Sequence, residues 1–102
     1  NGNRADVVDA TITVPNAGID AAGPRRLRIT SDPGIGLTVR PWSTGELNRA
    51  RHHGALRADG CTWVTLSCAL HGVGSAACGP EPLPEYTLHA RTVTYDLTFS
   101  VA

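Results

Sequence analysis

The sequence predicts an all-β fold, a two-layer antiparallel β-sandwich of immunoglobulin-like or Greek-key type. The clearest support is an alternation of apolar with polar residues near the carboxyl end, which is the period of a strand buried on one face. Its apolar row is Val93, Tyr95, Leu97, Phe99 and Val101. Composition agrees, because 11 Gly and 7 Pro with only 18% charged residues are typical of a turn-rich sheet protein. A small barrel is the alternative.

Five to seven strands are expected, and the segments that indicate them are residues 6–14, 25–30, 35–39, 61–70 and 86–102. The side chains expected to face the core are Val8, Ala10, Ile12 and Val14 in the first strand, Leu27 and Ile29 in the second, and Val64, Leu66, Cys68 and Leu70 in the fourth. Asp32-Pro33-Gly34 predicts a turn between the second and third strands. A loop is expected over residues 16–24.

A short helix is expected near residues 44–53. Ser43 or Thr44 could cap its start, and Glu46 lies three residues after Ser43, as in a capping box. Gly54 or Gly60 could end it. Few apolar side chains lie in this stretch, so a structured crossover loop is the alternative.

The last segment changes phase along its length. Leu88 and Ala90 share one phase, whereas the residues from Val93 onward take the other. This slip at Arg91 and Thr92 predicts a β-bulge or a tight hairpin. The preceding Gly-, Ala- and Pro-rich stretch, residues 71–84, is expected to form a long loop of the kind that often carries function.

Three cysteines allow one disulfide. Cys61 and Cys68 lie on one expected strand, where seven extended residues place them roughly 23 Å apart, too far to pair. We therefore expect a Cys68–Cys78 bridge, with Cys61–Cys78 as the second choice. The leftover thiol is expected to be buried, and an intermolecular bridge is the alternative.

Charge and size exclude several classes of protein. At 102 residues and 10.7 kDa the chain is expected to be a single β-sandwich domain over residues 1–102. The formal net charge is zero and the nine basic residues are scattered, so we expect no nucleic-acid partner. Arg25, Arg26 and Arg28 form the one cluster, which reads as a solvated strand face, with an anion site as the alternative. Every basic residue is Arg, as in a GC-rich bacterium.

No motif for catalysis or for a cofactor stands out. The sequence has no GxSxG elbow, and His52, His53, His71 and His89 do not have the spacing of a zinc site. A cleft with paired carboxylates is not expected in so small a domain. We therefore predict no enzyme, no catalytic residues, no metal and no cofactor.

The candidate binding segment is the loop just before the last strand. Three prolines stiffen it into an extended conformation that would lose little entropy on binding a groove. Its residues are Cys78, Gly79, Pro80, Glu81, Pro82, Leu83 and Pro84. Prolines that merely separate two strands are the plainer interpretation.

These observations favour a secreted or cell-surface, non-enzymatic module that binds a protein or surface partner through loops or a sheet edge. The sequence lacks Met, and no apolar run approaches the roughly 20 residues of a membrane span, so we expect a processed, secreted chain. Both a monomer and an oligomer are compatible with the sequence. One alternative is a small protease inhibitor presenting Cys78–Pro84. The stretches ITV (12–14) and VTYDLTFS (93–100) are loosely similar to bacterial subtilisin inhibitors. The other alternative is a pilus-like subunit that donates strand 6–14.

Overall fold

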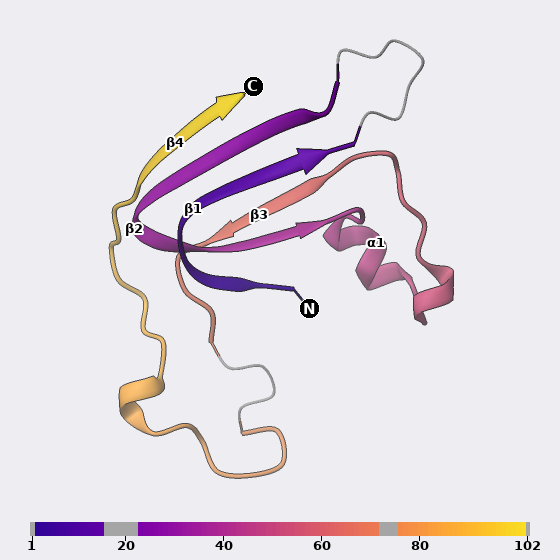
Figure 1. Cartoon of the computed structure of the whole chain (residues 1–102). Helices are drawn as coiled ribbons and strands as arrows, with labels where there is room; N and C mark the ends of the chain where they lie inside the picture. The colour runs from indigo at the N-terminus through magenta and orange to yellow at the C-terminus, as the bar shows by residue number, and fades with distance from the viewer. Residues whose placement is uncertain (1, 16–22, 72–75, 102) are drawn as a thin grey trace.

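The computed structural model describes residues 2–15, 23–71 and 76–101. Four strands and one α-helix make up its regular structure (Figure 1). In chain order the elements are β1 (Arg4–Val14), β2 (Arg25–Arg40), α1 (Thr44–Arg49), the 3-10 helix η1 (His53–Ala55), β3 (Trp63–Ser67), the 3-10 helix η2 (Pro84–Tyr86) and β4 (Asp96–Val101).

All four strands belong to one antiparallel sheet, with β2 at its centre. On one side of β2, β1 pairs along most of its length. On the other side, β4 pairs with the first half of β2, residues 27–32, and β3 pairs with the second half, residues 36–40. Each half of β2 therefore has its own edge strand.

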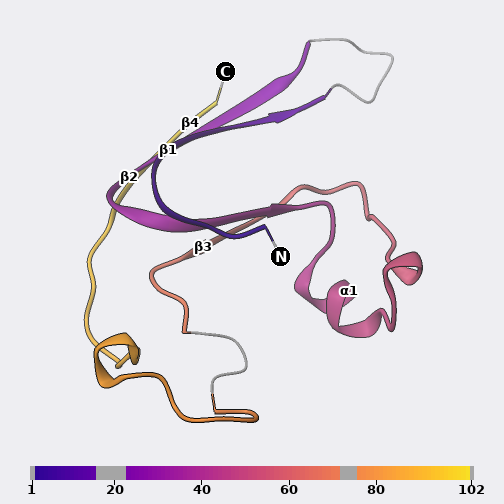
Figure 2. The ribbon, with the colours of Figure 1, turned by 60° about the horizontal axis from the view of Figure 1, so that its bottom comes forward.

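A bend in β2 folds this single sheet into two layers (Figures 1 and 2). The first, called here the β4 layer, contains β4 and the first half of β2; the second, the β3 layer, contains β3 and the second half. The bend lies at Asp32–Gly34, where the Asp32–Pro33 peptide is cis. β1 follows β2 through the bend with two register shifts, and its Asp6 adopts a left-handed conformation with φ 53°.

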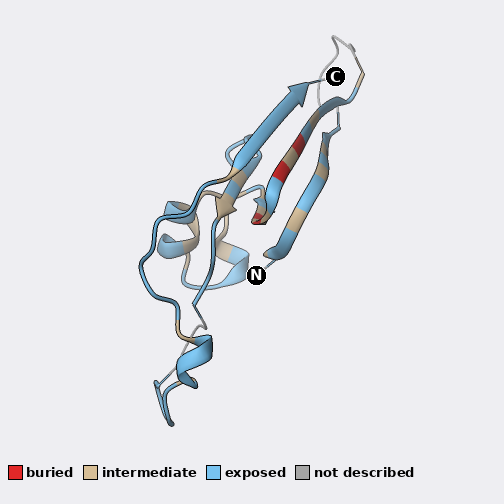
Figure 3. Cartoon of the chain, turned by 90° about the vertical axis from the view of Figure 1, so that its left-hand side faces the viewer, coloured by how far each residue is buried: buried red, intermediate tan, exposed pale blue. Residues whose placement is uncertain are grey.

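The core lies close to the bend and is small. The buried positions in the described part of the chain all belong to β2 (Figure 3): Ile29, Ser31, Ile35 and Leu37. Away from the bend the two layers diverge, and the inner faces become exposed (Figure 2). The radius of gyration is 17.1 Å, against about 13 Å for a compact domain of this length. Much of the apolar inner surface thus remains open.

The expected all-β class, with antiparallel layers and one short helix, is confirmed. The first expected strand is observed as β1, and the middle of the fourth is observed as β3. The phase of β1 differs at its start, where Val7 is half-buried and Val8 is exposed, because a register shift separates Val7 from Asp9. Part of the expected loop 16–24 lies outside the described residues.

Three expected strands differ from the structure. The second and third strands are one continuous strand, because Asp32-Pro33-Gly34 bends β2 without reversing it. The last strand is confined to Asp96–Val101, whereas residues 87–95 leave the sheet. The phase slip at Arg91 and Thr92 therefore marks a segment outside the sheet and not a bulge within a strand.

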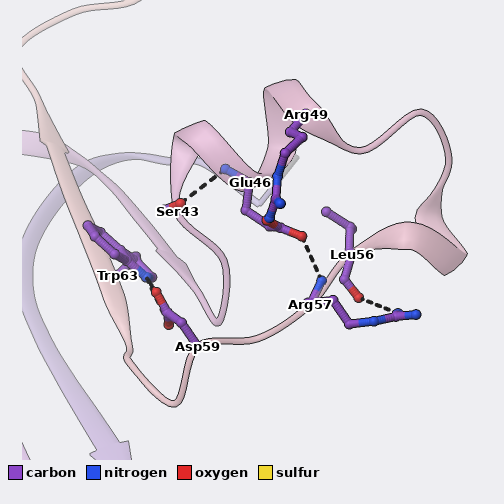
Figure 4. Close-up of polar contacts among 7 residues, drawn as sticks. All are labelled: Ser43, Glu46, Arg49, Leu56, Arg57, Asp59 and Trp63. Atoms are coloured by element: carbon purple, nitrogen blue, oxygen red, sulfur yellow. Dashed lines mark hydrogen bonds and ion pairs between the residues drawn. The ribbon is translucent and has the colours of Figure 1, made fainter.

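The connection from β2 to β3 is held by Glu46 in α1 (Figure 4). The expected cap is confirmed, since Ser43 Oγ accepts a hydrogen bond from the Glu46 amide at 3.0 Å. The Glu46 carboxylate pairs with Arg49 and accepts a bond from the Arg57 amide at 2.9 Å. One side chain thus contacts both the helix and the segment that returns to β3.

Candidate functional site

The most distinctive region is the long connection between β3 and β4, residues 68–95, called here the long loop; of these, 68–71 and 76–95 are described. Two hydrogen bonds join its start to its end. The Tyr95 hydroxyl donates to the Cys68 carbonyl at 3.1 Å, and the Leu88 amide donates to His71 Nδ1 at 3.4 Å. These two hydrogen bonds hold the start and the end of the long loop together, although the loop lies outside the sheet. The paired ends are called here the base of the loop.

Two hollows with common lining residues lie beside this closed base. The first has a volume of about 280 Å³ and is lined by Cys68, Ala69, Leu88, His89, Ala90, Arg91, Val93 and Tyr95. The second, of about 400 Å³, is lined by Leu70, Glu85, Tyr86, Thr87, Leu88, His89 and Arg91. Aliphatic and aromatic side chains mixed with a few hydrogen-bonding groups suit a small polar molecule or the side chains of another protein segment.

The expected binding segment, Cys78–Pro84, lies in the described part of the long loop but does not line either hollow. Most of it is exposed; Leu83 is 60% exposed, and Pro82 is half-buried. Pro84 begins η2, where a proline suits the first helical turn. The loop therefore presents an apolar side chain directly before a rigid turn.

The predicted Cys68–Cys78 disulfide is wrong. Cys61, Cys68 and Cys78 are all free thiols, and all three are exposed. Cys68 lies at the base of the long loop, where its carbonyl accepts the bond from Tyr95. Hydrogen bonds therefore close the loop where a disulfide was expected. The expectation that the leftover thiol is buried is also wrong.

Among the described residues, three carboxyl groups have displaced pKa values, and all three are displaced downward. The Arg28 guanidinium, bonded to Asp9 at 2.6 and 3.0 Å, lowers the pKa of that carboxyl. Arg49 and the Arg57 amide lower the pKa of Glu46.

The third of these carboxyl groups belongs to Asp59. Its pKa is lowered by the Cys61 amide and by the Trp63 indole, which donates to the carboxylate at 3.0 Å. The donors that lower these pKa values all belong to this chain, so the three carboxyl groups suit structural roles.

The arginine cluster divides into one ion-paired residue and two residues that line a hollow. Arg28 forms the ion pair with Asp9 on the solvent face, as expected for a strand. Arg25 and Arg26 lie at the end of β2 farthest from the bend and line a separate hollow described below.

The histidines are dispersed over the structure. His53 contacts Trp42 edge to face, with ring centroids 6.0 Å apart, and His71 accepts the bond from Leu88. Within the described ranges, no three His, Cys, Asp or Glu side chains gather as a metal site would require. No helix among those residues is long and apolar enough to cross a membrane.

Sequence reasoning missed the residues that line the two hollows. Leu88, His89, Arg91 and Tyr95 were assigned to a strand because apolar residues alternate there. The available signal was the phase slip at Arg91 and Thr92, which interrupts the alternation where the chain leaves the sheet. Nothing in the local pattern indicates that Tyr95 reaches back to Cys68, since that contact spans 27 residues.

The family model described as "Beta galactosidase small chain" matches residues 1–101. A β-galactosidase of Staphylococcus xylosus is 29% identical over 73 residues, which cover 72% of this chain and 7% of that protein. A β-galactosidase of Kluyveromyces lactis is 30% identical over 105 residues, which cover 97% of this chain and 9% of that protein. No solved structure matches the chain.

These matches correct the functional expectations. The chain is similar to parts of glycoside hydrolases, so the prediction of a non-enzymatic secreted binding or surface-assembly module is wrong. The protease-inhibitor and pilus-subunit alternatives are wrong for the same reason. The loose similarity to subtilisin inhibitors involved only two short stretches of strand-forming residues. Because the family model spans residues 1–101, the chain belongs to the β-galactosidase small-chain family.

Proposed function

We propose that this chain is a structural component of a β-galactosidase and that the enzyme containing it hydrolyses β-galactosides. The observation that carries the proposal is the family match over residues 1–101. The chain spans less than a tenth of the length of the curated relatives it matches, 7% and 9%. The proposed activity is therefore that of the larger enzyme, to which these residues contribute.

This chain contributes structure to the enzyme: its surfaces pack against other parts of the enzyme and position them. Asp9, Glu46 and Asp59 are each held ionised by donors from this same chain, which supports structural roles for them. The open inner faces of the two layers and the exposed apolar side chains of the long loop supply surface for contact with another part of the enzyme. A protein partner of this kind replaces the surface partner expected from the sequence.

The long loop is one such contact. Leu83 and Tyr86 are 60% and 71% exposed on a segment whose base is closed by two hydrogen bonds. A pre-ordered loop loses little conformational entropy when it docks. The segment Cys78–Pro84 thus remains a proposed binding segment, now directed at the rest of a β-galactosidase.

The loop contact is tested with Leu83→Asp in the native enzyme. Placing a charge in an apolar contact is expected to lower the temperature of thermal inactivation, because the carboxylate must be desolvated without a partner. Glu81→Gln, a change at an exposed position two residues away, is the matched control. Equal inactivation temperatures for the two variants would contradict a contact at Leu83.

The function is tested by isolating the native protein that contains residues 1–102 and assaying nitrophenyl β-D-galactoside, with the α-galactoside and the β-glucoside as controls. We expect hydrolysis that is selective for the β-galactoside. A properly folded native protein that hydrolyses none of the three substrates, or that prefers the β-glucoside, would contradict the proposal.

A further inference from the structure

The inner face of β4 is an apolar surface that this chain leaves uncovered. In the register of the sheet, Leu97 lies opposite Ser31, Phe99 opposite Ile29, and Val101 opposite Leu27. Directly opposed residues of an antiparallel pair point to the same face. The apolar row of β4 therefore lies on the face where Ile29 is only 3% exposed.

Exposure along this row rises with distance from the bend. Leu97, Phe99 and Val101 are 36%, 53% and 80% exposed, respectively. The alternate residues of β4, Asp96, Thr98 and Ser100, are polar. A row of Leu, Phe and Val facing inward and a polar row facing outward is the pattern of a strand whose inner face is meant to be covered.

The two layers enclose an apolar hollow at this open end. It has a volume of about 210 Å³ and is lined by Ile12, Val14, Arg25, Arg26, Leu27, Thr62, Val64 and Val101. Val101 and Leu27 come from the β4 layer, whereas Val64 comes from the β3 layer. Aliphatic side chains of both layers therefore face a common space that the described chain does not fill.

The edge of β4 is also open to pairing. Within the described ranges, β4 is hydrogen-bonded to β2 on one side only. Its six residues include no Pro and no Lys, and its register with β2 is unbroken. The outer edge of β1 differs, because two register shifts and the left-handed Asp6 interrupt it. Bulges protect an edge strand from pairing, so β4 is better suited than β1 to receive a strand.

We propose that a β-strand from the remaining part of the same β-galactosidase pairs with the free edge of β4 and packs apolar side chains beside Phe99 and Val101 on the inner face. The proposal rests on the proposed function, since it takes the partner from the enzyme of which this chain is a part. The curated relatives extend far beyond the matched segment, which covers 7% and 9% of their lengths, so such an enzyme has ample chain to supply the strand.

The chemistry of the incoming strand follows from the surface it meets. Main-chain hydrogen bonds to β4 provide the attachment, and alternate apolar side chains fill the space between the layers. Arg25 and Arg26 line the open hollow, and their charges favour an acidic residue in the part of the strand that passes them. The occupant is thus an amphipathic strand with one acidic position, and not a helix or a soluble ligand.

Thiol labelling of the native enzyme tests this pairing with two neighbouring variants. Val101→Cys places a thiol on the inner row, and Ser100→Cys places one on the outer row of the same strand. Both positions are exposed in this chain, so without a covering strand they react alike. With the strand in place, position 101 is expected to react about tenfold or more slowly than position 100, because a covered thiol reacts only on local opening.

The native cysteines do not interfere with this measurement. Cys61, Cys68 and Cys78 all precede Arg91, so the tryptic peptide that begins at Thr92 excludes all three. Within that peptide, the fragment ions that contain position 100 or 101 report the introduced thiol by mass spectrometry. Denaturing the enzyme should equalise the two labelling rates. Equal rates in the folded enzyme would overturn the proposal.

Two further outcomes are informative. Protection of position 101 that disappears on dilution to a species with one copy of the enzyme would assign the cover to a second copy and overturn the proposal. Labelling is also independent of substrate hydrolysis. An active β-galactosidase with an open β4 contradicts the strand pairing alone, whereas a protected β4 in a protein without this activity contradicts the proposed function alone. Amide hydrogen exchange in the unmodified enzyme covers the case in which Val101→Cys fails to fold.

Discussion

Gly34 lies where β1 crosses the bend of β2. A Cβ atom built at Gly34 would approach the carbonyl carbon of Asp6 to 2.8 Å and its Cα to 2.9 Å. These are backbone atoms, so they cannot move aside by changing a rotamer. The close approach of two backbones at the bend therefore requires glycine at this position.

Gly34→Ala is expected to lower the free energy of unfolding by about 1–3 kcal/mol, since the added methyl group overpacks the bend. Gly45→Ala is the control, because a Cβ there meets only Ser43 Oγ, at 3.8 Å, and alanine favours the helix. Urea titration of the native protein measures both. A neutral Gly34→Ala would show that β1 does not lie against the bend.

Glu46 makes the connection between β2 and β3 sensitive to acid. Arg49, followed by the Arg57 amide, holds the pKa of the Glu46 carboxyl below its usual 4.5. A group whose pKa is lowered by folding stabilises the fold above its unfolded pKa and loses that effect as pH falls through the folded value. We therefore expect the α1 segment to loosen as pH falls below about 4.5.

Amide-exchange protection factors of Leu47 and Arg57, measured at pH 6 and pH 3, report this loosening. Both residues donate backbone hydrogen bonds in this connection, Leu47 to the Ser43 carbonyl and Arg57 to Glu46. Glu46→Gln removes the titrating group and should flatten the difference between the two pH values. A pH dependence unchanged in Glu46→Gln would assign the effect to another carboxyl group.

At the scale of elements, the base of the long loop depends on Tyr95. Tyr95→Phe removes the hydrogen bond to the Cys68 carbonyl, which is worth about 1 kcal/mol when well ordered. The loop base should open more often, and trypsin should cut faster after Arg91, which lies between the two closing bonds. Tyr86→Phe is the control at a tyrosine that is 71% exposed on η2. Equal cleavage rates in the two variants would show that the Tyr95 bond does not close the loop.

The alternation of apolar and polar residues predicted β1 and β3 well, because pairing with β2 places alternate side chains on opposite faces of the sheet. The alternation wrongly predicted a strand over residues 87–95, because the apolar side chains there do not lie on a sheet face. Leu88, Val93 and Tyr95 instead line the two hollows beside the base of the long loop. The cap at Ser43 was predictable, since it depends on residues three apart. The bend of β2 was not, because it depends on β1 pairing on both sides of Gly34, a long-range contact.

At the scale of the whole molecule, the sequence predicts one self-contained domain, whereas the structure leaves the inner faces of its two layers open. Composition indicates enough apolar residues for a core, yet the buried apolar positions among the described residues are Ile29, Ile35 and Leu37. The remaining apolar side chains lie on faces that diverge from the bend (Figure 2). No local pattern distinguishes a side chain buried within its own chain from one buried by another part of an enzyme.

Secretion of the protein stays a prediction from the sequence.

The central claim is that β4 is an interior strand of a larger β-galactosidase. Amide hydrogen exchange over Asp96–Val101 in the native, unmodified enzyme tests it most directly. A strand paired on both edges protects every amide, whereas an edge strand leaves the alternate amides that point away from β2 open to solvent. We predict slow exchange at all six positions. Fast exchange at alternate positions, as for the single pairing with β2 in this structure, would contradict the account.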